Sequence, residues 1–238
     1  MTTIASGETL PADFTRLGER AVLIDFGNRI DPDLNKKVMA LCRWLKDHPF
    51  PGFIEAVPAY ASAAVFFEPD AGGFSVEQPD PFERVTRHLR LGLNASTEFN
   101  PGRLITIPTL YDGPDLEFVA SSHDLMIEEV IRIHEEVVYD AYMIGFLPGF
   151  AYLGQVDPVI ATPRRSSPRT IVPSGSVGIA GRQTGIYPMD SPGGWQLIGR
   201  TPLLMFDPGR TEPCLIQAGD RVKFQSITEQ EFLRYHGR

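Results

Sequence analysis

The chain has 238 residues, of which 42% are hydrophobic and 22% charged, and its formal net charge at pH 7 is -8. This composition is typical of a soluble globular protein with one large or two small domains, and it excludes a chain disordered throughout. The acidic balance argues against a nucleic-acid-binding protein, and the longest nearly apolar stretch, residues 59–67, is about half of the roughly 20 residues that a membrane helix needs.

The N-terminal part predicts a small α+β domain. Apolar runs predict strands, and a helix is indicated where Asp31 suits the N-cap and Pro32 the first helical position. The simplest arrangement of these elements is a mainly antiparallel sheet with helices on one face. The predicted strands are residues 21–26, 54–57 and 61–67, and the predicted helices are residues 31–48 and 81–91.

A polar, turn-forming stretch at residues 93–102 is the best candidate for a domain boundary. The expected domains are residues 1–97 and 98–238. In the second, a strand at residues 104–108 precedes a helix that Ser121 or Ser122 can cap. Short apolar segments then alternate with Gly and Pro turns, which predicts a β-barrel or a β-sandwich. These segments are residues 139–144, 176–180, 196–198, 203–206 and 221–225.

Glycine and proline are concentrated between residues 145 and 213, which hold 11 glycines and 10 prolines. Such a block indicates a chain locked into specific turns, where binding groups are often presented. It carries 6 basic and 4 acidic side chains, whereas residues 101–144 carry 2 and 9. A local surplus of arginine suits a small anion such as a carboxylate or a phosphate.

Common catalytic and metal-binding motifs are missing from the sequence. There is no Walker loop, and the segment around Ser174 lacks the first glycine of a nucleophile elbow. The histidines form no H-x-x-x-H or H-E-x-x-H pair, and Cys42 and Cys214 belong to no C-x-x-C pair. We therefore expect no metal site and no disulfide framework. Because the first residues lack the basic and apolar regions of a signal peptide, we expect a cytoplasmic location.

A series of unusual segments lies between residues 145 and 202: GFLPGFAYLG, VPSGSVGIAG, QTGIYP, SPGGW and IGRTP. These segments closely resemble the signature of the family of 5-oxoprolinase B subunits (PxpB) and KipI, the first subunits of the allophanate-hydrolase-like carboxyltransferases. The resemblance runs over nearly the whole chain, from AVLIDFG at residue 21 to the FDP turn at residue 206.

The resemblance implies a fold and a function. The implied fold is an α+β N-terminal domain followed by an all-β, cyclophilin-like barrel. The implied function is that of an ATP-dependent 5-oxoprolinase subunit, which opens the lactam of 5-oxo-L-proline to L-glutamate. The implied partners are a homologous second subunit (PxpC/KipA-like) and a LamB/YcsF-like subunit (PxpA-like). Since no nucleotide loop is present, ATP is expected to be bound with or by a partner, and the chain alone is expected to be inactive.

Two other functions share the same signature. One is a KipI-like inhibitor that docks on the dimerisation domain of a sensor histidine kinase. The other is a urea carboxylase or allophanate hydrolase subunit, which would require a biotin carboxylase partner. The chain has no biotinyl-lysine motif of the Met-Lys type, its lysines being Lys36, Lys37, Lys46 and Lys223.

Candidate substrate-binding residues lie in the Gly/Pro-rich block. An arginine fork binds a carboxylate bidentately, so Arg169 and Arg200 are candidate anion clamps. The amide of Gln183 can read the N–H and C=O groups of a lactam. Gly193 and Gly194 permit close approach of the backbone to a ligand. The alternative for each of these arginines and for Gln183 is an ordinary surface or loop role.

Three further residues are candidate catalytic groups. Tyr187 and Ser191 can donate hydrogen bonds to a developing oxyanion, the alternatives being a barrel-rim aromatic and a turn former. His134 falls on the apolar stripe of its predicted helix. A core imidazole is therefore favoured there over a general base, although the general-base role stays open.

Overall fold

The computed structural model describes residues 12–27, 29–71, 80–95 and 101–236. The chain divides into two compact units, Met1–Asn100 and Pro101–Arg238, and each has a hydrophobic core of its own. The domain boundary predicted after residue 97 falls outside the described residues. Within the part that is described, no helix is long and apolar enough to cross a membrane.

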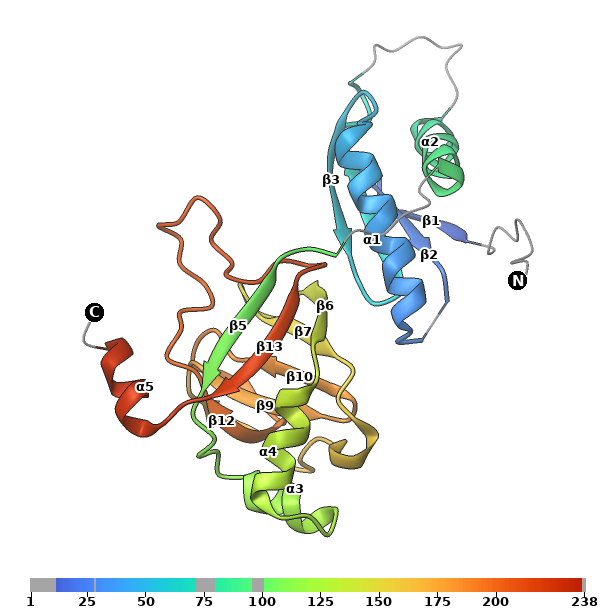
Figure 1. Ribbon diagram of the computed structural model, residues 1–238. Helices are drawn as coiled ribbons and strands as arrows, with labels where there is room; N and C mark the ends of the chain where they lie inside the picture. The colour runs from blue at the N-terminus through green and yellow to red at the C-terminus, as the bar shows by residue number, and fades with distance from the viewer. Residues whose placement is uncertain (1–11, 28, 72–79, 96–100, 237–238) are drawn as a thin grey trace, which may run out of the picture. The chain divides into compact units, whose positions relative to one another are not determined.

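The first unit is a four-stranded antiparallel sheet with two helices (Figure 1). Its elements are β1 (Asp13–Leu17), β2 (Ala21–Asp25), α1 (Pro32–Asp47), β3 (Phe53–Pro58), β4 (Ser62–Phe67) and α2 (Pro81–Ala95). The strand order is β1-β2-β4-β3. All five predicted elements are present, and β1 is an additional strand that the apolar pattern did not reveal.

The start of α1 follows the predicted local chemistry. The Asp31 carboxylate accepts hydrogen bonds from the backbone N–H groups of Asp33 and Leu34, at 2.9 and 3.3 Å. These bonds satisfy two donors that a helix start leaves free. The apolar faces of both helices then bury one face of the sheet, since side chains of both pack with residues of the two central strands. The buried members are Val22, Ile24, Val38, Leu41, Cys42, Leu45, Ala63, Val65, Phe67, Val85 and Leu89.

The second unit is built around a seven-stranded sheet in the order β12-β9-β10-β7-β6-β13-β5 (Figure 1). Its strands are β5 (Leu104–Thr109), β6 (Tyr139–Ile144), β7 (Ala151–Gly154), β8 (Arg169–Val172), β9 (Ser176–Ala180), β10 (Gln183–Ile186), β11 (Ser191–Gly193), β12 (Gln196–Arg200) and β13 (Arg221–Ser226). Its helices are α3 (Leu116–Ser122), α4 (Ile127–Glu136) and α5 (Glu229–His236), with a short 3-10 turn at Pro158–Ile160. β8 and β11 pair separately as a two-stranded sheet.

The seven-stranded sheet nearly closes on itself as a barrel. Its outer strands are β5 and β12, and an antiparallel bridge between Leu110 and Arg200 joins the chain after β5 to the end of β12. The bridge consists of two backbone hydrogen bonds, of 2.8 and 2.9 Å. Of the barrel and the sandwich that the sequence left open, the structure therefore has the barrel. The cyclophilin-like character implied by the family resemblance stays a prediction.

The predicted helix cap at Ser121 or Ser122 is wrong. α3 ends at Ser122, whose hydroxyl donates to the backbone oxygen of Phe118 at 2.7 Å instead of starting a new helix. α4 starts at Ile127, and the backbone N–H of Met126 donates to the Glu129 carboxylate at 2.8 Å. At this helix start it is thus a glutamate three residues into the helix that accepts the backbone N–H of the N-cap residue.

The predicted strand at residues 203–206 is also absent. In this segment only Phe206 makes a β-bridge, with Cys214. Apolar residues in this loop, among them Met205, are buried against the barrel core, so the apolar pattern reflects packing without strand pairing. A short apolar run does not by itself separate these two cases.

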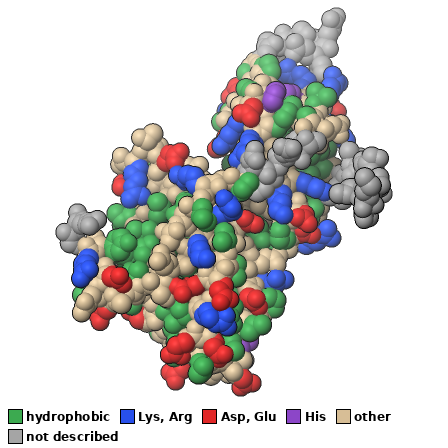
Figure 2. All heavy atoms as spheres, in the orientation of Figure 1, with side chains coloured by type: hydrophobic (Ala, Val, Ile, Leu, Met, Phe, Trp, Pro, Cys, Tyr) green, Lys and Arg blue, Asp and Glu red, His purple; other side chains and the backbone are tan. Residues whose placement is uncertain are grey.

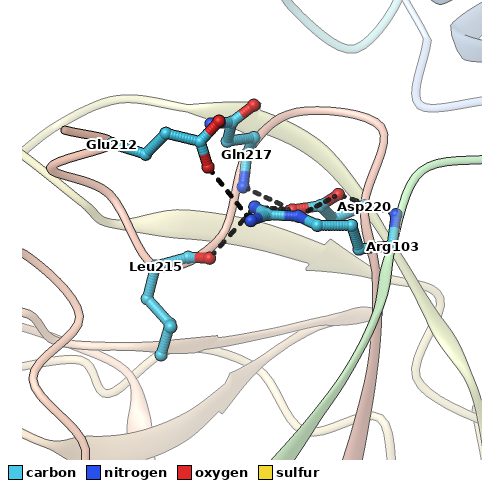
Figure 3. A network of polar contacts seen from close by, with 5 residues as sticks. All are labelled: Arg103, Glu212, Leu215, Gln217 and Asp220. Carbon is cyan, nitrogen blue, oxygen red and sulfur yellow. Dashed lines mark hydrogen bonds and ion pairs between the residues drawn. The ribbon is translucent and has the colours of Figure 1, made fainter.

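The long loop between β12 and β13 is anchored by a salt bridge between Arg103 and Asp220 (Figure 3). The Asp220 carboxylate is 6% exposed and accepts the Arg103 guanidinium at 2.7 Å and the Arg103 backbone N–H at 3.0 Å. It also accepts the backbone N–H of Gln217 at 2.9 Å, while Arg103 donates to the carboxylate of Glu212 and the backbone oxygen of Leu215. These contacts hold the end of the loop against the start of β5.

Acidic side chains gather over α3 and α4, in the lower part of the view in Figure 2. They are Glu117, Glu128, Glu129, Glu135 and Glu136. This acidic surface corresponds to the stretch in which the sequence places 9 acidic and 2 basic side chains.

Candidate functional site

The Gly/Pro-rich block brings several predicted site residues together on the small β8–β11 sheet. In that sheet Gly193 pairs with Arg169, and Ser191 pairs with Val172. Trp195 follows β11 and packs with its ring centroid 5.3 Å from that of Phe150. Arg169, Ser191 and Gly193 thus lie on neighbouring strands, as their predicted roles in one site require.

Asp115, at the start of α3, is the centre of the polar network beside this sheet. Its carboxylate is 5% exposed, and one oxygen accepts from the guanidinium groups of both Arg165 and Arg169, at 2.9 and 2.7 Å. The other oxygen accepts from the backbone N–H of Leu197 at 2.7 Å. Because Asp115 lies 50 and 54 residues before its two arginine partners, no local pattern in the sequence pointed to it.

Arg169 is therefore already paired with a carboxylate of its own chain. Its side chain is 22% exposed, with one terminal nitrogen on Asp115. The other terminal nitrogen, Nη1, is buried and has no hydrogen-bond partner among the described residues. One half of the predicted fork is thus committed to the fold, and contact of Arg169 with a substrate stays a prediction.

Arg200 lies in a different environment. Its guanidinium pairs with the Asp112 carboxylate at 2.8 Å and lies 4.6 Å from the ring centroid of Phe232 on α5. Both ionic side chains are more than 40% exposed. The two predicted clamps share neither carboxylate nor aromatic partner, so the structure does not unite Arg169 and Arg200 in one site.

Tyr187 is packed beneath Gly193. Its ring is 1% exposed, and a Cβ atom built at Gly193 would lie 2.7 Å from Cε1 and 2.8 Å from Cζ of that ring. Burial raises the pKa of Tyr187, so its phenol stays protonated at neutral pH. Gly193 is needed for this contact, whereas Gly194 has its nearest neighbours on Pro168 at 3.7 Å. The predicted oxyanion role of Tyr187 stays a prediction.

Ser191 and Gln183 both occupy strands. Ser191 is 8% exposed, and its hydroxyl has no hydrogen-bond partner among the described residues. Gln183 begins β10 and pairs through its backbone with Ala180 and Gly154 on the neighbouring strands. Neither arrangement tests the substrate contacts predicted for these two side chains.

His134 lies in the core of the barrel unit with no exposed surface. Thr184 Oγ1 donates to the backbone oxygen of Gly178, so it accepts from Nε2–H of His134 at 2.9 Å. Nδ1 then accepts from the Tyr111 hydroxyl at 2.8 Å. Burial lowers the pKa of His134 to about 3, so the ring is neutral at physiological pH. This environment favours the alternative, a core imidazole with both nitrogens bonded, over the general-base role.

A cavity of about 650 Å³ opens between the end of α3 and residues 162–167. Phe118 and His123 lie on the α3 side, and Gln196 of β12 completes the lining. His123 Nε2 bonds to Thr162 Oγ1 at 3.1 Å, which links the two sides of the cavity. This volume is in the range of small-molecule sites, roughly 300 to 1,000 Å³.

The charged groups of the cavity wall are Arg164, Arg165 and Asp115. Arg164 is exposed, and it has no ion pair with any carboxylate of the described residues. Its guanidinium lies 5.9 Å from the ring centroid of Trp195. The sequence analysis singled out neither Arg164 nor Arg165 as a site residue, although the basic surplus of their block pointed to an anion. Because two of the three charged groups are arginines, the wall can hold a small anion.

The same wall does not fit a nucleoside triphosphate. Among the described residues that line it there is no lysine, and the three charged groups sum to a single positive charge. A triphosphate carries several negative charges and is normally cradled by a Gly-rich loop with a lysine. Within the described residues, no group of three or more His, Cys, Asp or Glu side chains could hold a metal ion.

Comparison with known proteins gives consistent relatives. Residues 12–216 match the family model described as carboxyltransferase domain, subdomain C and D. The 5-oxoprolinase B subunit of Bacillus subtilis (strain 168) is 45% identical over 95% of this chain and 98% of its own length. The 5-oxoprolinase B subunit of Escherichia coli O157:H7 is 39% identical over 87% of this chain and 93% of its own length.

Solved structures also resemble this one. TTHA0988 is 37% identical with a TM-score of 0.75, over 88% of this chain, and the chain spans 40% of the length of that protein. The K. lactis urea amidolyase has a TM-score of 0.71 at 20% identity, over 96% of this chain and 16% of its own length. That last likeness shows a shared fold alone.

Proposed function

The chain belongs to the carboxyltransferase domain family, subdomains C and D, within the group of 5-oxoprolinase B subunits, and from this premise we propose that it is one subunit of a 5-oxoprolinase. In this proposal the assembled enzyme is an amide hydrolase that opens 5-oxo-L-proline to L-glutamate with hydrolysis of ATP. The observation that carries the proposal is the similarity to the Bacillus subtilis protein over nearly the full length of both chains.

The proposal assigns the parts of the reaction to different subunits. The cavity between α3 and residues 162–167 suits a small anion, whereas its wall does not suit a triphosphate. We therefore assign the nucleotide to a homologous second subunit or a LamB/YcsF-like subunit, and the chain alone is inactive. A cytoplasmic location is part of this proposal, because ATP is a cytoplasmic reactant.

The urea-related alternative has weaker support. Urea amidolyase of Lachancea kluyveri is 24% identical over 93% of this chain, which is 14% of the length of that protein. Similarity at this level agrees with a common fold and does not point to a common substrate.

Reconstitution tests the proposed function. The chain is purified and combined with the second subunit and the LamB/YcsF-like subunit of the same organism, and glutamate release from 5-oxoproline is measured with and without ATP. We expect release only from the complete mixture with ATP. No release from the complete mixture contradicts the proposal. Turnover by the purified chain alone contradicts the division of labour, and inhibition of a sensor kinase by an otherwise inactive chain would favour the regulatory alternative.

A further inference from the structure

We infer that the cavity between α3 and residues 162–167 binds the carboxylate of the substrate, with the Arg164 guanidinium as its anchor. This inference rests on the proposed function, because a lactam acid supplies both the carboxylate and the amide. It differs from the sequence prediction, which placed the anion on Arg169 and Arg200. The ligand class is a small molecule with one carboxylate beside an amide or lactam.

Arg164 is selected because its arginine neighbours already pair with carboxylates of the chain itself. Arg165 and Arg169 share one oxygen of Asp115 at 2.9 and 2.7 Å. Arg200 pairs with Asp112, outside this network. Arg164 lines the same cavity, and its guanidinium has no carboxylate partner among the described residues. Of the two arginines that line the cavity, Arg164 is therefore the one that can take an external anion without giving up a carboxylate partner, while its guanidinium lies over the ring of Trp195.

The backbone on either side of Arg164 is held in place. Gln196, which is 4% exposed, donates from Nε2 to the backbone oxygen of Pro163 at 2.9 Å. The backbone N–H of Arg165 donates to the backbone oxygen of Gly194 at 2.7 Å. Fixing the residues before and after Arg164 reduces the ordering cost of binding, as in other pre-organised sites. The Arg165 side chain, tied to Asp115, then lies in the same wall without competing for the ligand.

The charge of the wall favours a single carboxylate over a polyanion. Arg164, Arg165 and Asp115 together carry one positive charge, which one carboxylate balances. Arg169, which pairs with the same Asp115 carboxylate, brings the total to two positive charges, still fewer than the negative charges of a triphosphate. A triphosphate would bring several negative charges next to the buried Asp115 carboxylate, where like charges repel. A planar guanidinium fork also matches the geometry of a carboxylate.

The test compares Arg164→Gln with Arg164→Lys in the reconstituted complex. Removing a charge-assisted hydrogen bond predicts a rise of about tenfold to hundredfold in KM for 5-oxoproline in Arg164→Gln, with KM for ATP unchanged within about twofold. Arg164→Lys keeps the charge and loses the fork, so we expect an intermediate KM. The matched control is Arg132→Gln on α4, which loses a surface pair with Glu136 and leaves both KM values unchanged.

Three results of this test would overturn the inference. An unchanged KM for 5-oxoproline in Arg164→Gln overturns it, and so does a fall in kcat alone. A rise in KM for ATP without a rise for 5-oxoproline also overturns it, because the anion would then be a phosphate. Melting temperatures of the variants are measured in parallel, and since Arg164 is exposed we expect them to match the unchanged chain.

The unmodified complex distinguishes failure of the proposed function from failure of the carboxylate site. If that complex does not open 5-oxoproline, the proposed function is wrong, and the carboxylate site is then tested by calorimetric titration of the chain with 5-oxoproline and with inorganic phosphate. Heat of binding with 5-oxoproline that is lost in Arg164→Gln supports the site. Equal heats for the two proteins, or binding of phosphate only, overturn it.

Discussion

Gly193 leaves the space that the ring of Tyr187 occupies, since a Cβ atom at Gly193 would come within 2.7 Å of ring carbon Cε1. The sequence interpretation explained the Gly193–Gly194 pair by approach of a substrate. The structure gives Gly193 an internal reason, the packing of a buried tyrosine, and leaves Gly194 as the member of the pair that can still serve a ligand.

Gly193→Ala is expected to destabilise the fold. Tyr187 is 1% exposed and packs against other aromatic rings, so it cannot move away from the added methyl group. Overpacking of this kind costs about 1 to 3 kcal/mol, which lowers the melting temperature by roughly 2 to 12 °C for a chain of this size. The control is Gly194→Ala, whose Cβ would have 3.7 Å to its nearest neighbours. Equal melting temperatures for the two variants would contradict this explanation.

Arg200→Lys is expected to leave the kinetics of the complex unchanged. The Arg200 guanidinium is exposed, pairs with Asp112 and covers Phe232, so its replacement removes a surface contact worth about 1 kcal/mol or less. KM for 5-oxoproline and kcat should both stay within about twofold of the unchanged complex. A rise of tenfold in KM would restore Arg200 as an anion clamp.

Asp115→Asn is expected to destabilise the β8–β11 region strongly. The substitution removes the one carboxylate that Arg165 and Arg169 share. Because this carboxylate is buried while its partners are 37% and 22% exposed, we expect a loss of about 2 kcal/mol, between the values for exposed and for fully buried pairs. Unfolding in urea measures the change. Asp112→Asn is the matched control, because it breaks an exposed pair with Arg200 and should cost less than about 1 kcal/mol. Similar losses in the free energy of unfolding of both variants would mean that burial of Asp115 does not make its ion pairs more stabilising.

Asp220→Ala is expected to loosen the loop between β12 and β13. The variant removes the carboxylate that holds the Arg103 side chain and the backbone N–H groups of Arg103 and Gln217 (Figure 3). A loss of about 3 kcal/mol follows from leaving these donors without an acceptor. Hydrogen exchange of the Gln217 amide should accelerate more than exchange in the first unit. Glu212→Ala, which removes an exposed partner of Arg103, should change little.

The free energy of unfolding is expected to decrease as the pH drops below about 6.5, because burial lowers the pKa of His134 to about 3. The unfolded chain takes up this proton near pH 6.5 and the folded chain does not, so protons favour unfolding between pH 6.5 and about 3. The loss between pH 7 and pH 5.5 is about 1 kcal/mol, measured by urea unfolding. His134→Gln cannot titrate at this position, so its loss over the same window should be smaller by that amount. Parallel curves would contradict the assignment.

Local chemistry predicted those elements whose signals lie within a few residues. Asp31 and Pro32 defined the start of α1, and the structure shows the predicted capping bonds. β11, in contrast, consists of Ser191, Pro192 and Gly193, which disfavour a strand on propensity. It forms because β8 pairs with it across a gap of about twenty residues, and such pairing is invisible to a local pattern.

The candidate site was predicted only in part for the same reason. Arg169 was found through the local basic surplus, but Asp115 and the cavity it lines depend on contacts between α3 and a loop some 50 residues later. His134 shows the opposite case. Its place on an apolar helical stripe was sufficient to favour a core role, which its buried hydrogen bonds now support.

The bridge between Leu110 and Arg200 also limits how other proteins can bind the barrel unit. An open sheet offers free backbone N–H and C=O groups at its outer strands, and a partner can add a strand there. In the described part of the chain, the bridge occupies such groups where the two outer strands of the seven-stranded sheet meet. Strand addition at that seam would first have to break the bridge, so a partner protein that binds there has to recognise side chains. The first unit differs, because β1 and β3 are outer strands of its sheet and can accept an added strand.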